Sequence, residues 1–305
     1  MEARAVYKIQ IKGRVGLPET AEMLSPEGFF LQPMLNSRGD SVVYWGKKKG
    51  ETGFNIWRTD LDGKMPVKLT DMQAVSGQPF WTSDGKNILF FSTFGMSPET
   101  EWNASEQFKI KRSPRNIWIM GKDGKDRRKL TDGPHVDERP CITPDGKSVV
   151  FVSNRSGHLN LWSVSMDTGS LKQVTKHNGL DYRPVFSPDG KYLAFFTTSN
   201  NKVRRHDLCI MTWPDGEASF PAGPGVFKWI HGPFWLADSK SILIHAGTTK
   251  IKSSLWILDL GDKHTEQLVL PGIPFYGHGS LNADESLLVF DSPISAELII
   301  EKEKK

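Results

Sequence analysis

Two arginines stand in matching motifs and have side chains suited to binding an acid. Arg139 occurs in D-E-R-P and Arg183 in D-Y-R-P. Guanidinium groups bind carboxylates and phosphates through paired hydrogen bonds, so two of them facing one space would form an anion site. A plainer interpretation is that each arginine pairs with the acid two positions earlier, Asp137 or Asp181, and fixes the start of its strand. Both interpretations stay open at the level of sequence.

Two histidines add a second kind of chemistry. His231 in W-I-H-G-P and His278 in Y-G-H-G-S could ligate a divalent metal such as manganese, zinc or calcium, together with Gln32 or Gln78. Glycines on both sides of His278 clear space around its imidazole. Alone, His278 could act as a catalytic base or as a polar anchor.

All these residues lie at the start of a repeated unit. Five copies open with a proline and the sixth with a glycine, at intervals of 44 to 61 residues: Pro33, Pro79, Pro140, Pro184, Pro233 and Gly279. A turn follows, such as S-P-D-G-K at 187–191, where Pro188 and Gly190 supply the backbone angles of a tight turn. Short apolar strands come next. Strand-rich units at this spacing are typical of propeller blades.

The pattern predicts an all-β fold, a six-bladed β-propeller of four-stranded antiparallel blades. We expect the N-terminal strand to close the ring, with Val6–Ile11 pairing with Glu297–Ile300 and so removing exposed sheet edges. The whole chain, 1–305, would form one domain. The expected blades lie near 30–71, 76–131, 137–175, 181–222, 230–270 and 276–300, with the closing strand at 5–12.

In such a ring the residue before each opening residue should face the central axis. The residues predicted to ring the channel mouth are Gln32, Gln78, Arg139, Arg183, Gly232 and His278, with Tyr182 and His231 one step farther out. On the same face, the loops between second and third strands carry lysines and arginines, whereas aspartates gather in the turns of the opposite face. A basic face favours an anionic partner, either an acidic saccharide or an acidic protein segment.

The repeats resemble those of the TolB type, whose pattern is similar to R-P-x-F-S-P-D-G-K-x-I-x-F-x-S followed by I-W and L-T. The resemblance covers roughly residues 30–292 and is strongest in the third and fourth units. It implies a propeller, a fold that this family uses in periplasmic scaffolds, in peptidases and in polysaccharide lyases. The site also looks similar to that of an oligogalacturonate lyase built from such blades. That enzyme uses histidine and glutamine side chains as metal ligands, and its substrate is anionic. We expect the chain to differ from TolB, which carries an export signal and an extra N-terminal domain, and from the peptidases, because no G-x-S-x-G motif occurs in the sequence.

The composition of the chain limits the classes of protein to which it can belong. The formal net charge is +4 and there are only two cysteines, which argues against a disulfide framework. We see neither a signal peptide nor an apolar run that could span a membrane, so we expect a cytoplasmic protein without membrane insertion, or a periplasmic one if an upstream signal was removed. Basic and aromatic residues interleave too sparsely to favour nucleic acid.

Three hypotheses follow from these observations. The first is a non-catalytic propeller that binds an anionic ligand at its basic channel mouth. The alternative is a lyase or hydrolase acting on a uronate-type oligosaccharide, with His278 as base and a metal or the two arginines neutralising the carboxylate. The third is an assembly scaffold that binds through its rim.

Overall fold

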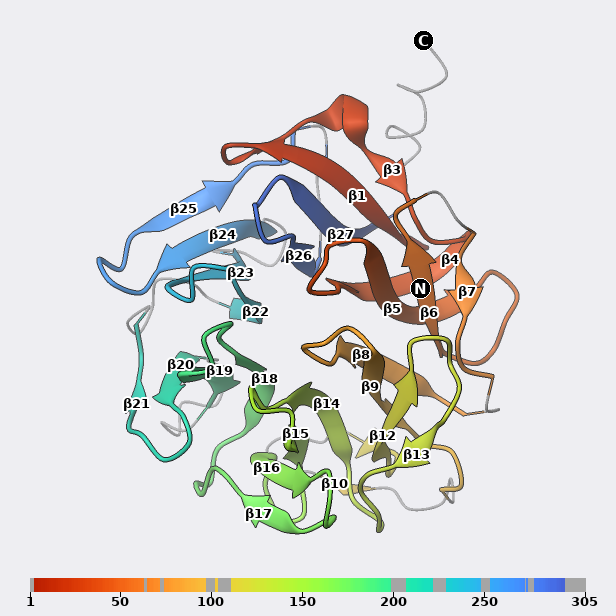
Figure 1. Ribbon diagram of the computed structural model, residues 1–305, viewed down its shortest axis with the longest axis vertical. Coiled ribbons are helices and arrows are strands. Elements are labelled where there is room, and N and C mark those ends of the chain that lie inside the picture. The colour runs from red at the N-terminus through yellow and green to blue at the C-terminus, as the bar shows by residue number, and fades with distance from the viewer. Residues whose placement is uncertain are drawn as a thin grey trace.

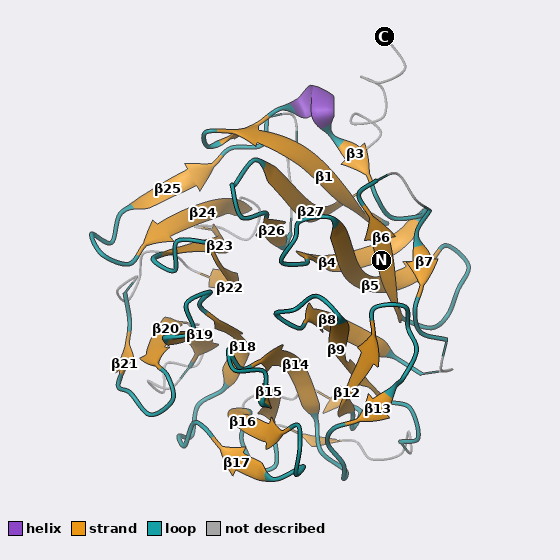
Figure 2. Cartoon of the chain, in the orientation of Figure 1, coloured by secondary structure: helices purple, strands orange, loops and turns teal. Residues whose placement is uncertain are grey.

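The computed structural model describes residues 3–62, 65–71, 74–96, 102–103, 111–198, 207–221, 229–247, 253–271, 273 and 277–293. Strands arranged around a central axis make up nearly all the regular structure of this part of the chain (Figure 1). Its one helix is the 3₁₀ turn η1 (Pro18–Thr20), coloured purple in Figure 2. No helix in these ranges is long and apolar enough to cross a membrane.

Four sheets have the four-stranded antiparallel form expected of a propeller blade. Their strands are β8 (Ser76–Trp81), β9 (Asn87–Ser92), β12 (Asn116–Gly121) and β13 (Arg128–Lys129); β14 (Asp137–Ile142), β15 (Ser148–Ser153), β16 (Asn160–Ser165) and β17 (Leu171–Gln173); β18 (Asp181–Phe186), β19 (Tyr192–Thr197), β20 (Asp207–Thr212) and β21 (Ala218–Ser219); and β22 (Trp229–Trp235), β23 (Ser241–Gly247), β24 (Ser253–Asp259) and β25 (Thr265–Leu268). In each sheet the first strand lies nearest the axis (Figure 1).

The first and last repeats do not form separate blades. Within the described residues they share one nine-stranded sheet. Its strands are β26 (Gly279–Leu281), β27 (Leu287–Pro293), β1 (Arg4–Lys12), β4 (Gly28–Leu35), β5 (Ser41–Lys48), β6 (Asn55–Asp60) and β7 (Val67–Lys68), with β2 (Val15–Gly16) and β3 (Glu22–Met23) beside β1. A two-stranded pair, β10 (Trp102–Asn103) and β11 (Lys111–Arg112), lies outside these sheets.

The prediction of six four-stranded blades is therefore wrong. The described residues form a propeller with four such blades, and the other repeats are merged. The reason is the N-terminal strand β1, which pairs with β27 from Arg4↔Pro293 to Gln10↔Leu287 and also bridges β4 in parallel at Arg4↔Phe29. One strand thus joins the last repeat to the first. The partner that the sequence predicted for it, Glu297–Ile300, lies outside the described residues.

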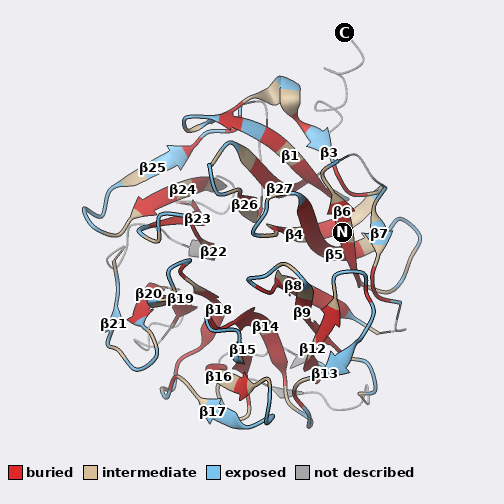
Figure 3. Ribbon diagram, in the orientation of Figure 1, coloured by how far each residue is buried: buried red, intermediate tan, exposed pale blue. Residues whose placement is uncertain are grey.

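The turns and second strands explain the core. Ser187 Oγ bonds Asp189 Oδ1 at 2.7 Å and accepts the Tyr192 N–H at 3.0 Å, which closes the turn before β19. The strand that follows is apolar at successive positions because it is buried on both faces between neighbouring sheets. Figure 3 shows the result: inner strands are largely buried, whereas outer strands such as β13 and β17 are exposed.

Candidate functional site: the axial cavity

The first strand of five repeats carries a bulge at the same place. The pairing register shifts across Leu31/Met34, Gly77/Phe80, Glu138/Cys141, Tyr182/Val185 and His231/Phe234. A proline sits in each bulge, where its missing N–H costs no ladder hydrogen bond. The residue before the proline adopts a left-handed backbone, with φ of 53° at Gln32 and Gln78 and 54° at Arg139 and Arg183. Such angles are costly for residues with a Cβ, and bulges of this kind re-aim a side chain.

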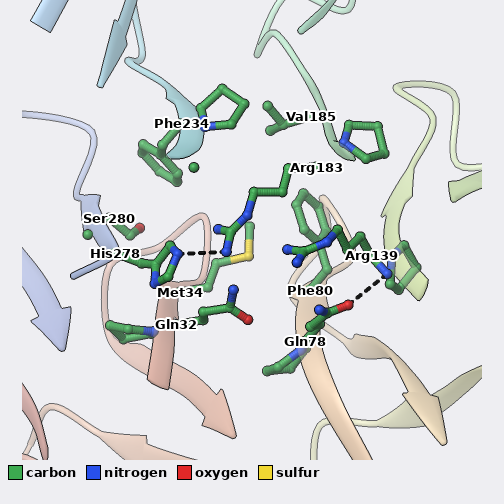
Figure 4. Close-up of a pocket in the computed structure, with 17 residues that line it drawn as sticks. Gln32, Met34, Gln78, Phe80, Arg139, Arg183, Val185, Phe234, His278 and Ser280 are labelled. Atoms are coloured by element: carbon green, nitrogen blue, oxygen red, sulfur yellow. Dashed lines mark hydrogen bonds between the residues drawn. The ribbon is translucent and has the colours of Figure 1, made fainter. Parts of the chain in front are cut away.

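The re-aimed side chains line one cavity on the axis (Figure 4). Its volume is about 120 Å³. The mouth consists of Gln32, Gln78, Arg139, Arg183, Gly232 and His278; five prolines and Gly279 follow; and the remaining lining is Met34, Phe80, Val185, Phe234 and Ser280. The six residues that the sequence predicted to ring the channel are thus brought together.

Arg183 and His278 meet across the cavity. Arg183 Nη2 lies 2.6 Å from His278 Nε2, and the guanidinium reaches towards the imidazole in Figure 4. A guanidinium can only donate, so Nε2 must accept. The imidazole proton then lies on Nδ1, 3.3 Å from Asp291 Oδ1. His278 is therefore a neutral histidine held between a cation and a carboxylate.

Asp291 anchors this side of the cavity. Its buried carboxylate accepts a hydrogen bond from Arg4 Nη2 at 2.7 Å, and from the backbone N–H groups of Gln32 at 3.1 Å and His278 at 3.0 Å. Burial alone would raise the pKa of Asp291, but His278, Arg4 and the Gln32 N–H lower it to about 2. Asp291 thus stays ionised and fixes β4, β1 and the residue before β26 relative to one another.

His245 lies behind His278, with the two ring centroids 6.2 Å apart. Burial lowers the pKa of His245 to about 3, and the nearby cations Arg183 and Arg4 act in the same direction, against Asp291. His245 is therefore neutral at physiological pH. It places an uncharged polar ring behind His278.

Arg139 lies on the opposite side, against a buried acid. Its Nε is 3.6 Å from Glu138 Oε1, and Arg115 Nη1 is 3.6 Å from the other oxygen, Oε2. The Arg139 N–H also donates to Gln78 Oε1 at 3.0 Å, a bond drawn in Figure 4. Arg139 therefore shares one buried carboxylate with a second arginine.

The acids two positions before the arginines have other partners. Asp137 is fully buried and accepts hydrogen bonds from Arg155 Nη2 and Ser153 Oγ, both at 2.6 Å. Asp181, also buried, bonds Thr175 Oγ1 at 2.5 Å and lies 2.9 Å from His177 Nε2. The interpretation in which Arg139 and Arg183 pair with these acids is not what we find, because the bulge turns both arginines towards the axis.

Two other predicted site residues do not join the cavity. Tyr182 is 8% exposed and packs in the core between sheets, so it does not line the cavity. The backbone of His231 pairs with His245, but its side chain falls outside the described residues. The predicted metal pair of His231 and His278 is thus left as a prediction.

The described residues do not suit a divalent cation at His278. They contain no cluster of three or more histidine, cysteine, aspartate or glutamate side chains that could hold a metal. More directly, Nε2 of His278 faces the Arg183 guanidinium at 2.6 Å, and a cation bound there would have to displace this positive group.

Sequence reasoning missed Asp291, His245 and the pairing of Glu138 with two arginines. A signal for the first two was present in the repeat. The fifth residue after the turn is apolar in four units, namely Trp45, Phe91, Val152 and Phe196, but it is His245 in the fifth and Asp291 in the sixth. This position lies directly behind the mouth: even Trp45 bonds Gln32 Oε1 through its indole N–H at 2.8 Å.

Comparisons with known proteins agree with this architecture. Residues 96–213 match the family model of the TolB beta propeller domain. A TolB homolog of Chlorobium chlorochromatii is 23% identical over 142 residues, covering 38% of this chain and 32% of that protein. The matched regions span only 12 to 33% of the length of the curated relatives.

Solved structures share the fold at low sequence identity. TolB from Acinetobacter baumannii superposes with a TM-score of 0.65 at 17% identity, covering 88% of this chain and 63% of that one. An oligogalacturonate lyase in complex with manganese superposes with a TM-score of 0.61 at 12% identity, covering 92% and 82%. From the motifs, the family match and the shared architecture, the repeats of this chain are TolB-type β-propeller repeats.

Proposed function

We propose that this propeller binds an anionic ligand, through a carboxylate or a phosphate, at the mouth of its axial cavity. One observation carries the proposal: among the described residues that line the cavity, the charged ones are Arg139 and Arg183, and no carboxylate lines it. An anionic group at this point would balance the positive charge of these two arginines.

Arg183 is the group best placed to bind the anion. Within the described residues, its guanidinium hydrogen-bonds only to His278, a neutral acceptor, although a guanidinium has five N–H donors. Burial and the charge of Arg139 lower the pKa of Arg183, with Asp291 and Glu138 acting against them. Arginine nevertheless keeps its proton at physiological pH. A part-buried cation with so little compensation attracts an acid strongly.

The size of the cavity limits what enters it. At about 120 Å³ it is smaller than the roughly 300–1,000 Å³ of a typical ligand pocket. It therefore takes the acidic group and its immediate neighbours, while the rest of a longer ligand stays outside the cavity. An acidic protein segment and an acidic saccharide both meet this description.

The cytoplasmic location expected from the sequence also stays a prediction.

The test is binding of an acidic peptide and an oligogalacturonate to wild type, Arg183→Met and Arg128→Met by titration calorimetry. Arg128 is an exposed arginine on β13 and serves as the matched control. Charged hydrogen bonds contribute about 1.5–3 kcal/mol, so Arg183→Met should weaken binding roughly 10- to 100-fold while Arg128→Met does not. Equal binding by all three proteins would refute an anion site at the axis.

A lyase acting on a uronate is the second candidate, and one observation favours it. Asp291 orients the His278 imidazole so that its Nε2, the basic nitrogen, faces the cavity beside Arg183. In a β-elimination Arg183 would neutralise the uronate carboxylate, and His278 would take the proton from the adjacent carbon. A carbon–carbon double bond would form as the glycosidic oxygen on the next carbon leaves and takes a proton from water. The same titration mixtures decide this: an enzyme would generate the ultraviolet absorbance of an unsaturated uronide, and His278→Gln would abolish it.

A further inference from the structure

The cavity has two chemically different levels. The mouth carries the polar side chains of Gln32, Gln78, Arg139, Arg183 and His278. Two residues farther along each first strand, the lining becomes Met34, Phe80, Val185 and Phe234, which we call the apolar belt. Ser280 is the polar residue at this level, and its Oγ accepts the Leu35 N–H at 3.3 Å. A ring of polar side chains thus lies above a largely apolar ring.

The belt is held in place by the core behind it. Phe80 packs against two clusters of buried side chains, Phe234 against a third and Met34 against a fourth. Val185 belongs to a core cluster itself and is 8% exposed. These side chains have one face in the protein and one towards the cavity, so the belt cannot turn away from a ligand. It is a preformed apolar surface.

We propose that the ligand is a carboxylic acid whose carboxylate is attached directly to an apolar group. This rests on the proposed anion site at Arg183. Strands rise about 3.3 Å per residue, so the belt lies at most about 7 Å beyond the mouth. A carboxylate at Arg183 therefore places its own substituent between Val185 and Phe234.

The belt discriminates between the acids considered above. A sugar acid would present hydroxyl groups to Val185, Phe234 and Met34, which offer them no hydrogen bond, and burying an unpaired hydroxyl is costly. A short aliphatic or aromatic acid has no hydroxyl group to bury against these side chains, so it avoids this desolvation cost. The C-terminal carboxylate of a peptide ending in an apolar residue has the same chemistry, because its side chain branches from the carbon that bears the acid.

A homologous series of straight-chain acids from acetate to hexanoate tests the proposal. Each added methylene that enters the belt should tighten binding about fourfold, the equivalent of about 0.8 kcal/mol. Galacturonate should bind more weakly than hexanoate. An affinity that does not depend on chain length would overturn the apolar belt as a binding element.

A matched pair of variants locates the effect. Met34→Gln keeps the length of the side chain and makes the belt polar, so the rise in affinity per methylene should fall. Met23→Gln makes the same change on β3, where the methionine is 44% exposed and does not line the cavity, and should leave the series unchanged. Thermal unfolding of both proteins verifies that they are folded. A series unaffected by Met34→Gln would contradict the proposal.

Peptides separate the two sources of the acid. A pentapeptide ending in leucine is compared with its C-terminal amide and with hexanoate. Tighter binding of the free peptide identifies a chain terminus, whereas tighter binding of hexanoate identifies a small molecule; either supports an apolar carboxylate. If galacturonate binds at least as tightly as all three, this inference fails and the anion site stands. If no acid binds, the proposed function fails as well.

Discussion

The starts of the third and fourth repeats have nearly the same sequence, D-E-R-P and D-Y-R-P, but their arginines do different work. Arg139 follows a buried glutamate and shares its carboxylate with Arg115. Arg183 follows a tyrosine and contacts a neutral histidine instead. One substitution in the repeat, Glu138 against Tyr182, therefore separates an arginine that is compensated by the protein from one that is left for a ligand.

The largest effect that would test this comparison comes from removing each arginine. Arg139→Met removes one of the two arginines that pair with the buried Glu138 carboxylate, and breaking a buried ion pair costs about 3 kcal/mol. Arg183→Met loses one hydrogen bond but relieves a poorly compensated cation, so the free energy of unfolding should change by less than about 1 kcal/mol. Urea unfolding measures both. Equal losses of stability would show that the two arginines are equivalent.

Acid titration gives the next largest effect. Asp291 stabilises the wall of the axial cavity that faces Arg183, through its contacts with His278 and Arg4. The pKa of Asp291 is lowered to about 2. A carboxylate with a depressed pKa contributes stability that is complete above about pH 4 and is lost as the pH falls through 2. This part of the acid dependence is worth about 2 kcal/mol. Unfolding curves between pH 2 and 5 should show it in wild type and not in Asp291→Asn. The same slope in both would assign the stability to other carboxylates.

The smallest effect distinguishes the two buried aspartates. Asp137 pairs with an arginine, Arg155, whereas Asp181 pairs with a histidine, His177. The hydrogen bond from Asp181 raises the pKa of His177 against the effect of burial. That contribution is complete below the ordinary histidine pKa and is lost as the pH rises through the raised value. Amide exchange in β18 should therefore speed up between pH 6 and pH 8, after correction for intrinsic rates, and β14 should not change. Parallel behaviour of both strands would contradict this.

Much of the fold could be predicted from the sequence, because the turns and apolar strands recur in each repeat and form through interactions between residues close together in the chain. Ser187, Pro188 and Gly190 specify a turn without reference to the rest of the chain. The number of separate sheets was not accessible, since it depends on β1 meeting both β27 and β4, contacts between residues that are far apart in sequence. The sequence predicted which residues reach the axis, but not the left-handed bulge that turns them there.

The partners of these residues were harder to predict than their positions. Pairing Arg183 with Asp181 was reasonable from their spacing, yet the bulge inverts the direction that strand alternation would give. Asp291 and His245 could have been found by aligning the units and asking where a polar residue replaces an apolar one. Burial makes such exchanges costly unless the polar group has a partner.

The carboxylate of Asp291 also determines when the cavity can exist during folding. It bonds the Gln32 N–H and the Arg4 side chain, which are 259 and 287 residues away in the chain. Contacts of such sequence separation form slowly, because a long loop must close before they are made. The repeats in the middle can assemble from neighbouring strands, whereas the wall that carries His278 waits for both ends of the described chain. The cavity is therefore among the last parts of the molecule to form, and ligand binding would report complete folding.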